Sequence, residues 1–138
     1  MDDRRLERES GPAKRVADGD AVEVLRDMLP SQSVTEVRAY FPDPWPKRRH
    51  HKRRIVTAEL VEEFHRILNP GGLLRFASDS GDYVAWTLIL IRAHGGVVWL
   101  ADGPQDWRGR PADWPETRYE AKARHDGRAP MFLSFRRL

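Results

Sequence analysis

The sequence predicts a single domain of the α/β class. Short apolar segments rich in β-branched residues alternate with segments of about ten residues whose apolar side chains recur at helical spacing. Glycine and proline clusters separate these segments, and no internal repeat is present. Strands that alternate with helices of this length are typical of crossover units in a largely parallel sheet. Residues 1–138, 40% of them hydrophobic, suffice for one modest core.

The N-terminal region carries the weakest signals. Residues 1–15 are highly charged and contain the turn-forming pair Gly11-Pro12, so we expect either the remnant of a helix or a poorly ordered end. A short strand is expected over residues 16–20. The helix predicted for residues 21–29 has its apolar side chains at helical spacing, and Pro30 ends it.

The middle of the chain has sharper patterns. Residues 34–41 are predicted to form a strand that stops at Pro42 and Pro44, because proline lacks the N–H group that a sheet requires. The basic run that follows is expected to be a loop. Thr57 is a suitable N-cap for a helix over residues 58–68, which the sequence Asn-Pro-Gly-Gly ends.

The last elements continue the alternation. Residues 73–77 are predicted to form an apolar strand interrupted only by Arg75, and residues 81–93 a helix that ends near a pair of glycines. Two further strands are expected over residues 97–100 and 131–135. A loop rich in Trp, Pro and Arg separates them.

Composition excludes several classes of protein. The longest apolar run, Val84 to Ile91, is broken by Thr87 and is far shorter than the roughly 18–20 residues that a membrane span needs. The first residues lack the apolar stretch of a secretory signal. The chain has no cysteine, so disulfides and thiolate metal sites are excluded. We therefore expect a cytoplasmic protein with no membrane partner.

The basic charge of the chain is concentrated in one segment. Residues 41–54 read FPDPWPKRRHHKRR, with six Lys or Arg among the last eight positions. Removing those six from the 24 basic residues would turn the net charge of +3 into −3. A dense local block of cations is typical of a phosphate-binding surface, so this segment favours nucleic acid as the partner.

Three aspartates are candidates for a ligand site. Asp20, Asp43 and Asp79 each follow a predicted strand. In open α/β sheets, ligands bind outside the carboxyl ends of the strands, so one crevice could collect all three side chains. Each of these aspartates could instead have a purely structural role. Asp20 and Asp79 are suitable helix caps, and an aspartate between prolines favours a turn.

Residues 41–54 closely resemble the signature of bacterial tRNA (guanine-N7)-methyltransferases, which transfer a methyl group from S-adenosylmethionine to a variable-loop guanine. Further similar segments occur in the same order at residues 19–25, at 70–79 and at 115–120. The resemblance extends over roughly residues 16–138. It implies a Rossmann-like fold, S-adenosylmethionine as cofactor, tRNA as partner and a cytoplasmic enzyme of tRNA modification.

The resemblance also assigns roles to individual residues. Asp43 would be catalytic and, with Asp20, would contact the cofactor. The substrate would bind Lys47, Asp79, Thr117, Arg118, Tyr119 and Glu120. The RNA backbone would bind Arg49, His50, His51, Lys52, Arg53 and Arg54. No metal site is expected, because His50 and His51 are adjacent in sequence and His65 lies on a separate predicted helix without a third ligand.

The chemistry of guanine explains why such a site needs a fixed carboxylate. The N7 atom carries an in-plane lone pair, so no base has to deprotonate it before it attacks a sulfonium methyl group. The enzyme must instead align the two reactants. A carboxylate can accept hydrogen bonds from guanine N1–H and the exocyclic amine, and it stabilises a ring that becomes cationic. Asp43, between two prolines, suits this role.

One part of the family pattern is absent from the sequence. The family begins its catalytic domain with a strand and a glycine-rich turn that holds the cofactor, and then a second strand, and no Gly-x-Gly follows a predicted strand here. We therefore expect an incomplete Rossmann-like fold, the C-terminal part of a methyltransferase domain, with an unpaired edge on the 34–41 strand. Alone, such a chain should bind S-adenosylmethionine weakly or not at all, and a missing N-terminal segment or self-association are candidate partners.

Two other functions are compatible with parts of the sequence. A noncatalytic tRNA-binding remnant would keep the basic segment and lose cofactor binding. A metal-dependent nuclease would use Pro42-Asp43 and the Glu120-Ala121-Lys122 triplet, although the separation of the two is far too long and the triplet is expected in a loop.

Overall fold

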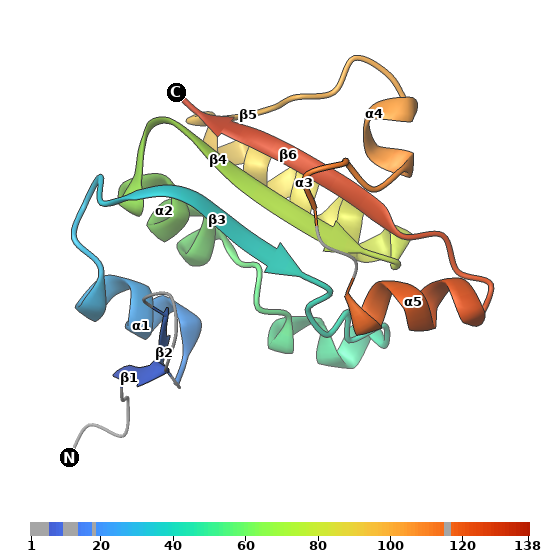
Figure 1. Ribbon diagram of the computed structural model, residues 1–138, viewed down its shortest axis with the longest axis horizontal. Helices are drawn as coiled ribbons and strands as arrows, with labels where there is room; N and C mark the ends of the chain where they lie inside the picture. The colour runs from blue at the N-terminus through green and yellow to red at the C-terminus, as the bar shows by residue number, and fades with distance from the viewer. Residues whose placement is uncertain (1–5, 10–13, 18, 115–116) are drawn as a thin grey trace.

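A computed structural model describes residues 6–9, 14–17, 19–114 and 117–138 (Figure 1). Its main feature is a four-stranded sheet of order β3-β4-β6-β5. The strands are β3 (Val34–Tyr40), β4 (Leu68–Ser78), β5 (Val97–Trp99) and β6 (Met131–Arg137). A separate two-stranded sheet pairs β1 (Leu6–Glu9) with β2 (Lys14–Ala17). The predicted α/β class is confirmed.

The expected largely parallel sheet is correct for the direction of most described strands but not for every pairing. Strands β3, β4 and β5 run in the same direction, whereas β6 is antiparallel to both of its neighbours, β4 and β5. The reason lies in where β6 begins. Met131 pairs with Ser78 at the carboxyl end of β4, so β6 must run in the opposite direction to its neighbour.

The three predicted helices are present with nearly the expected bounds, and further helical segments accompany them. The helices are α1 (Ala21–Met28), α2 (Ala58–Ile67), α3 (Gly81–His94), α4 (Gln105–Arg108) and α5 (Arg118–His125), with the 3₁₀ helix η1 (Arg48–Arg53) between β3 and α2. Thr57 caps α2 as predicted, since its side chain accepts the Leu60 N–H at 3.1 Å. Three segments that were expected to be loop are helical instead. The helices α4 and α5 lie between β5 and β6, and η1 occupies the basic run.

The helical segments that the sequence did not predict lack an apolar pattern. Only Glu120 and Ala123 of α5 are buried, so its sequence has no apolar periodicity that would reveal a helix. In η1 no residue is buried, and six consecutive basic residues carry no apolar signal. The four residues of α4 are too few to show a period.

The N-terminal predictions need correction. Among the described residues of 1–15, those of β1 and the start of β2 form an antiparallel hairpin rather than a helix remnant or a poorly ordered end, because each strand satisfies the backbone groups of the other. The strand expected over residues 16–20 ends at Ala17, since Asp20 already caps α1. Residues 1–5, 10–13 and 18, on which part of these predictions falls, lie outside the described residues.

The sheet has two faces of different character. The face toward α2 and α3 carries alternate side chains of β4 and β6, including Phe76 and Phe135, both at most 1% exposed. Figure 1 shows α3 passing behind this sheet. The opposite face forms a smaller cluster in which Trp114 packs edge-on against Phe132, with ring centroids 5.4 Å apart. Trp114 thus anchors the long loop onto the end of the sheet that carries the candidate residues.

In the described sheet β3 is an edge strand, so the predicted unpaired edge is confirmed for these residues. A cavity of about 430 Å³ lies beside it, with a mainly apolar lining drawn from α1, β3 and α2. In the part of the chain that the structure describes, no helix is both long and apolar enough to cross a bilayer.

Candidate functional site

The turn after β3 holds Asp43 in a strained backbone segment. Phe41 and Trp45, two residues to either side, have φ values of 49° and 41°. Such left-handed conformations are unfavourable for bulky side chains and persist only when other contacts enforce them. The Trp45 N–H donates to Asp43 Oδ1 at 3.0 Å, and the two prolines restrict the backbone further. The carboxylate therefore has a defined orientation.

Aromatic contacts tie this turn to the C-terminal part of the chain. The Phe41 ring lies 6.4 Å from the Tyr119 ring at an interplanar angle of 19°. It also meets Phe132 edge-on, at 6.5 Å and 84°. Together these contacts stabilise the left-handed conformation of Phe41 and bring residues far apart in the sequence to one place.

A cavity of about 330 Å³ opens at this point. Its walls come from the Asp43 turn, from the end of β4 and from α5, namely Phe41, Pro42, Asp43, Pro44, Asp79, Tyr119, Lys122 and Arg128. Asp79 forms an ion pair with Arg128 in the same wall. Asp79 does not cap α3, because Ser80 does so by accepting the Tyr83 N–H. Lys122 and Arg128 were not predicted, since nothing in their local sequence distinguishes them from other exposed cations.

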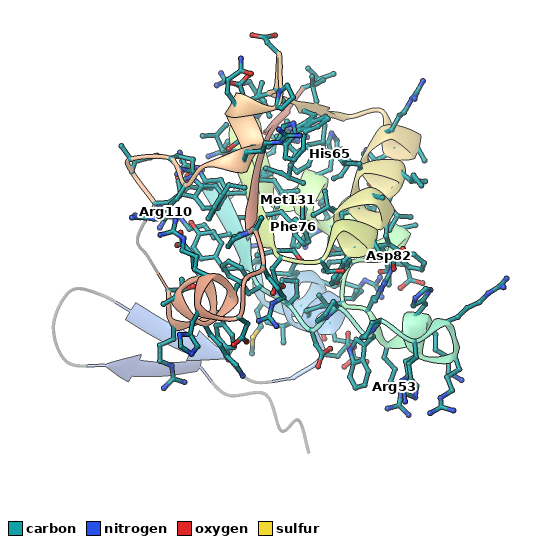
Figure 2. All side chains as sticks on the ribbon, turned by 90° about the vertical axis from the view of Figure 1, so that its right-hand side faces the viewer. Arg53, His65, Phe76, Asp82, Arg110 and Met131 are labelled. Carbon is teal, nitrogen blue, oxygen red and sulfur yellow. The ribbon has the colours of Figure 1, made fainter. Side chains whose placement is uncertain are left out.

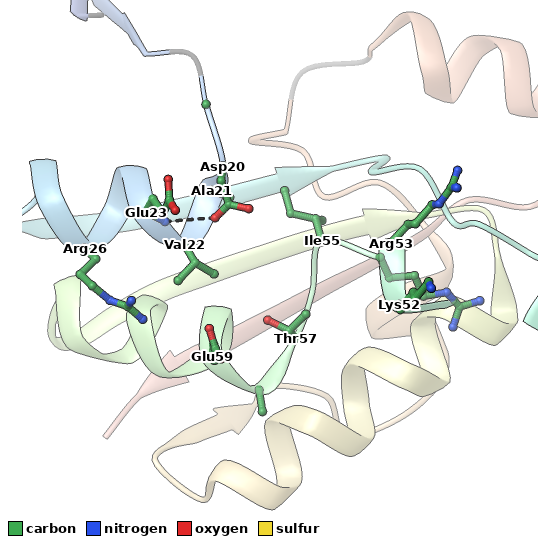
Figure 3. A pocket seen from close by; sticks show the side chains of 13 residues that line it. Asp20, Ala21, Val22, Glu23, Arg26, Lys52, Arg53, Ile55, Thr57 and Glu59 are labelled. Carbon is green, nitrogen blue, oxygen red and sulfur yellow. Dashed lines mark hydrogen bonds between the residues drawn. The ribbon is translucent and has the colours of Figure 1, made fainter. Parts of the chain in front are cut away.

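Asp20 lies elsewhere, so the predicted crevice with all three aspartates is wrong. Its side chain caps α1 by accepting the Glu23 N–H at 3.2 Å (Figure 3). It lines a larger cavity of about 910 Å³, which the basic side chains of Lys52 and Arg53 also border. The physical reason is that β2, which precedes Asp20, pairs with β1 and does not join the main sheet.

Of the predicted segment 117–120, only Tyr119 lines the cavity at Asp43. Thr117 caps α5 by accepting the Glu120 N–H at 3.1 Å. Glu120 is 1% exposed and accepts a hydrogen bond from Arg124 at 2.6 Å, so its carboxylate points into the protein. Arg118 is exposed and does not line the cavity. The preceding residues 115–116 of the similar segment lie outside the described residues.

Exposed cations follow the Asp43 turn in the chain, and Lys52 and Arg53 among them border the cavity at Asp20. We call the side chains of residues 47–53 the basic segment. In it Lys47, Arg48, Arg49, Lys52 and Arg53 are exposed, and His50 and His51 are half-buried. Figure 2 shows Arg53 at the lower end of the molecule. Trp45 does not line the cavity, because the Arg53 guanidinium lies 5.1 Å above its ring and His50 meets its edge at 5.7 Å.

Arg54 does not belong to this surface, and the prediction that it binds the RNA backbone is wrong. Its side chain is only 1% exposed. Nε donates to the Pro44 carbonyl at 2.7 Å, and Nη2 donates to Asp82. The guanidinium also lies 5.0 Å from the ring centres of both Tyr83 and Trp86. Arg54 thus connects the turn that contains Asp43 to α3, and its buried guanidinium is not accessible to a ligand.

The ion pair with Arg54 predicts how stability depends on pH. The hydrogen bond from Arg54 holds the pKa of Asp82 below its ordinary value of 3.8. Its stabilising contribution is therefore complete above about pH 4 and is lost as the pH falls through the lower pKa of the folded state. We expect Asp82→Asn to lose less stability than the wild type between about pH 5 and about pH 3 in urea denaturation. Asp102→Asn, at another exposed carboxylate, should follow the wild-type profile.

The nuclease alternative is not supported by the geometry. The Glu120-Ala121-Lys122 triplet lies in α5 and not in a loop, and Glu120 is turned toward arginines. Among the described residues, Asp43 belongs to no group of three potential metal ligands.

Comparison with known proteins shows the family of the chain. The profile of a family described as "Putative methyltransferase" matches residues 8–133. A tRNA (guanine-N(7)-)-methyltransferase of Rhizobium johnstonii is 50% identical over 124 residues, which are 90% of this chain and 53% of the relative. A protein of the same name from a Chelativorans species is 46% identical over 133 residues, 96% of this chain and 57% of the relative. The chain spans about half the length of these relatives.

A solved structure supports the fold. A protein from Thermus thermophilus, described as a "putative DNA modification methylase", has a TM-score of 0.53 and 20% identity over 86% of this chain and 50% of its own. At this identity the similarity concerns the fold alone, and it agrees with a partial Rossmann-like arrangement. The match of the profile to nearly the whole chain confirms the resemblance seen in the sequence, and the chain belongs to this methyltransferase family, with bacterial tRNA (guanine-N7)-methyltransferases among its relatives.

Proposed function

We propose that this protein transfers a methyl group from S-adenosylmethionine to N7 of a variable-loop guanine in tRNA, and that it acts in the cytoplasm. The observation that carries the proposal is the cavity in which Asp43, Asp79 and Tyr119 meet. The names of the relatives specify the same reaction.

Asp43 would orient the guanine. Its Oδ1 atom is already bound to the Trp45 N–H, which leaves Oδ2 to accept a proton donor of the base. Tyr119 is 60% exposed and nearly parallel to Phe41, so its ring offers a face against which a purine can pack. Asp79, Lys122 and Arg128 would border the base or its phosphate.

The resemblance also gives roles in substrate binding to Lys47, Thr117, Arg118 and Glu120, and we propose these roles here. Lys47 immediately precedes η1 and does not line the cavity. Glu120 would act indirectly by fixing α5, since its carboxylate is buried.

The residues suited to the cofactor lie on both sides of the apolar cavity beside β3. That cavity reaches from Gly19, next to Asp20, to Pro42, next to Asp43. A mainly apolar space of this size suits an adenine ring, and carboxylates at its two ends suit ribose hydroxyls and a cationic methionine group. S-adenosylmethionine supplies the electrophilic methyl group when bound. We propose Asp20 and Asp43 as its contacts in this chain.

The basic segment would hold the tRNA backbone through Arg49, His50, His51, Lys52 and Arg53. A guanine must leave its stack to enter a pocket, at a cost of a few kcal/mol, and phosphate contacts can offset part of that cost. The exposed positions of the cations support this role.

A double substitution tests this surface. We expect Arg49→Gln with Arg53→Gln to weaken tRNA binding and to lower the slope of log K against log salt by about 1.4–1.8, since each lost phosphate contact removes about 0.7–0.9. Fluorescence anisotropy with labelled tRNA over a salt series measures both quantities. The matched control replaces Arg92 and Arg136, two exposed arginines outside the segment, with Gln. Equal slopes for the two double variants would remove the basic segment from the proposal.

The reaction itself is best tested in a chimera, because the chain spans about half the length of its relatives. The 124-residue matching stretch of the Rhizobium protein is replaced by the residues of this chain. We expect the chimera to methylate a tRNA transcript and to leave unmodified a transcript whose variable-loop guanine is 7-deazaguanine, which has no N7. Mass spectrometry of nucleosides identifies the product. Equal methylation of both transcripts would contradict the proposed target atom.

The noncatalytic alternative is tested with the chain alone. Salt-sensitive tRNA binding without calorimetrically detectable binding of S-adenosylmethionine would favour an RNA-binding role for the isolated chain. Methyl transfer by the isolated chain at the rate of its relatives would instead overturn the expectation that it binds the cofactor weakly.

A further inference from the structure

We propose that Glu62, His65 and His94 form a binding site for a divalent transition metal, with zinc the best match. Glu62 and His65 lie on α2, and His94 is the last residue of α3. We call these three residues the histidine cluster. Figure 2 shows His65 near the top of the molecule and Arg53 at the bottom, so the cluster lies away from the basic segment. The proposed methyl transfer does not use it.

The geometry of the cluster is close to that of a three-ligand site. One ligand atom from each residue can be chosen so that all three lie within 4.8 Å of one another. His94 Nε2 is already 2.5 Å from Glu62 Oε2, and the two imidazole rings are 4.8 Å apart at their centres. Bonds of about 2.0–2.1 Å to a tetrahedral zinc ion place ligand atoms about 3.3 Å apart. Small side-chain movements would therefore complete the site.

The backbone leaves room for both rings. A Cβ atom at Gly96 would lie 2.9 Å from His65 Nε2 and 2.9 Å from His94 Cε1. Any residue other than glycine would push the two rings apart. The preceding Gly95 has a φ of 79°, which ends α3 and turns Gly96 toward the rings. The helix ending thus allows two imidazoles to converge against one carboxylate.

The charges around the cluster suit a cation of moderate affinity. Burial is the main cause that lowers the pKa of His65, with Arg137 and His94 contributing, and this direction favours the neutral imidazole that a metal requires. Glu62 supplies the one negative charge and is 62% exposed, which leaves access for the ion and a water molecule as fourth ligand. The nearby Arg137 guanidinium opposes the ion.

Metal binding requires one proton to move within His94. The Gly96 N–H donates to Nδ1 at 3.1 Å, so the neutral ring carries its proton on Nε2 and donates it to Glu62. A metal bound at Nε2 requires the proton to be on Nδ1, and the hydrogen bond from Gly96 is then given up. This exchange makes the site weaker than one whose second nitrogen already donates a hydrogen bond.

The donor set selects the class of metal. Two imidazoles and one carboxylate favour Zn²⁺, Co²⁺ or Ni²⁺ over Mg²⁺ and Ca²⁺, which prefer oxygen ligands. No metal site was expected from the sequence, because His65 had no third ligand in view. Packing of α3 against α2 brings His94 beside His65, a proximity that the sequence does not show.

Isothermal titration of the untagged, EDTA-treated chain with zinc chloride tests the site. We expect one zinc ion per chain, a rise in the melting temperature with zinc, and no comparable binding of magnesium chloride. His94→Gln and Glu62→Gln should each weaken zinc binding at least about 10-fold. Glu62 is exposed, so Glu62→Gln should leave the fold intact. Its zinc affinity can therefore be measured even if changes at His94 impair folding. His125→Gln, on α5, is the matched control and should bind as the wild type does.

Cobalt provides an independent readout of geometry. Co²⁺ bound in place of zinc should give the intense visible absorption of a four-coordinate site, and Glu62→Gln should reduce it. Unchanged zinc affinity in both His94→Gln and Glu62→Gln, or the loss of binding only when His50 and His51 are replaced, would overturn the proposal. Absence of zinc binding to the wild-type chain would overturn it as well.

Discussion

Replacing Asp43 with asparagine in the chimera is expected to slow methyl transfer to guanine by about 100- to 1000-fold, in the range seen when one group that stabilises a transition state is removed. Asparagine keeps an oxygen that can accept the Trp45 N–H, so the turn should persist. It lacks the negative charge that, in the proposed function, stabilises the methylated, cationic ring. Single-turnover rates with saturating tRNA and S-adenosylmethionine measure the chemical step.

The control for Asp43→Asn is a substitution at a carboxylate outside the candidate site. Asp102→Asn changes another exposed carboxylate in the same chain and should leave the rate unchanged. Affinity for tRNA should remain within a few-fold of wild type in both variants, because the basic segment is untouched. An Asp43→Asn protein that retains most of the wild-type rate would exclude this carboxylate from the reaction.

Replacing Arg54 with alanine is expected to lower the free energy of unfolding by about 3 kcal/mol, the scale of a broken buried charge interaction combined with lost packing. The substitution leaves the Pro44 carbonyl and Asp82 without their donor and empties the space between Tyr83 and Trp86. Because Asp82 is 66% exposed and regains water, the cost is at the lower end of the range for buried pairs.

Arg53→Ala is the matched control, since it removes the same side chain from the neighbouring position on the surface. We expect it to lower the free energy of unfolding by no more than about 1 kcal/mol, the scale of its exposed cation–π contact with Trp45. Urea denaturation followed by circular dichroism gives both values. Arg54→Lys should fall between them, because lysine keeps the charge but not the planar group that fits between two rings. Equal stability of the two alanine variants would contradict the structural role of Arg54.

Local signals in the sequence determined the main elements of this protein. The bounds of α1 and α2 follow from apolar periodicity and from residues such as Thr57, whose capping hydrogen bond spans three positions. The end of α3 follows from the glycine pair after His94. The end of β3 follows from two prolines. The motif around Asp43 also identified the family from the sequence alone, because its residues are consecutive and can be compared directly with the family's signature.

The tertiary structure decided which side chains meet. It buried Arg54 between α3 and the Asp43 turn while the adjacent Arg53 stayed on the surface. It brought Tyr119 into the cavity, turned Glu120 inward and placed His94 beside His65. Adjacent arginines in a basic run have nearly the same local sequence, so the sequence does not show which of them is buried. Only the packing of distant helices and strands distinguishes a structural arginine from an exposed one, or brings two histidines together.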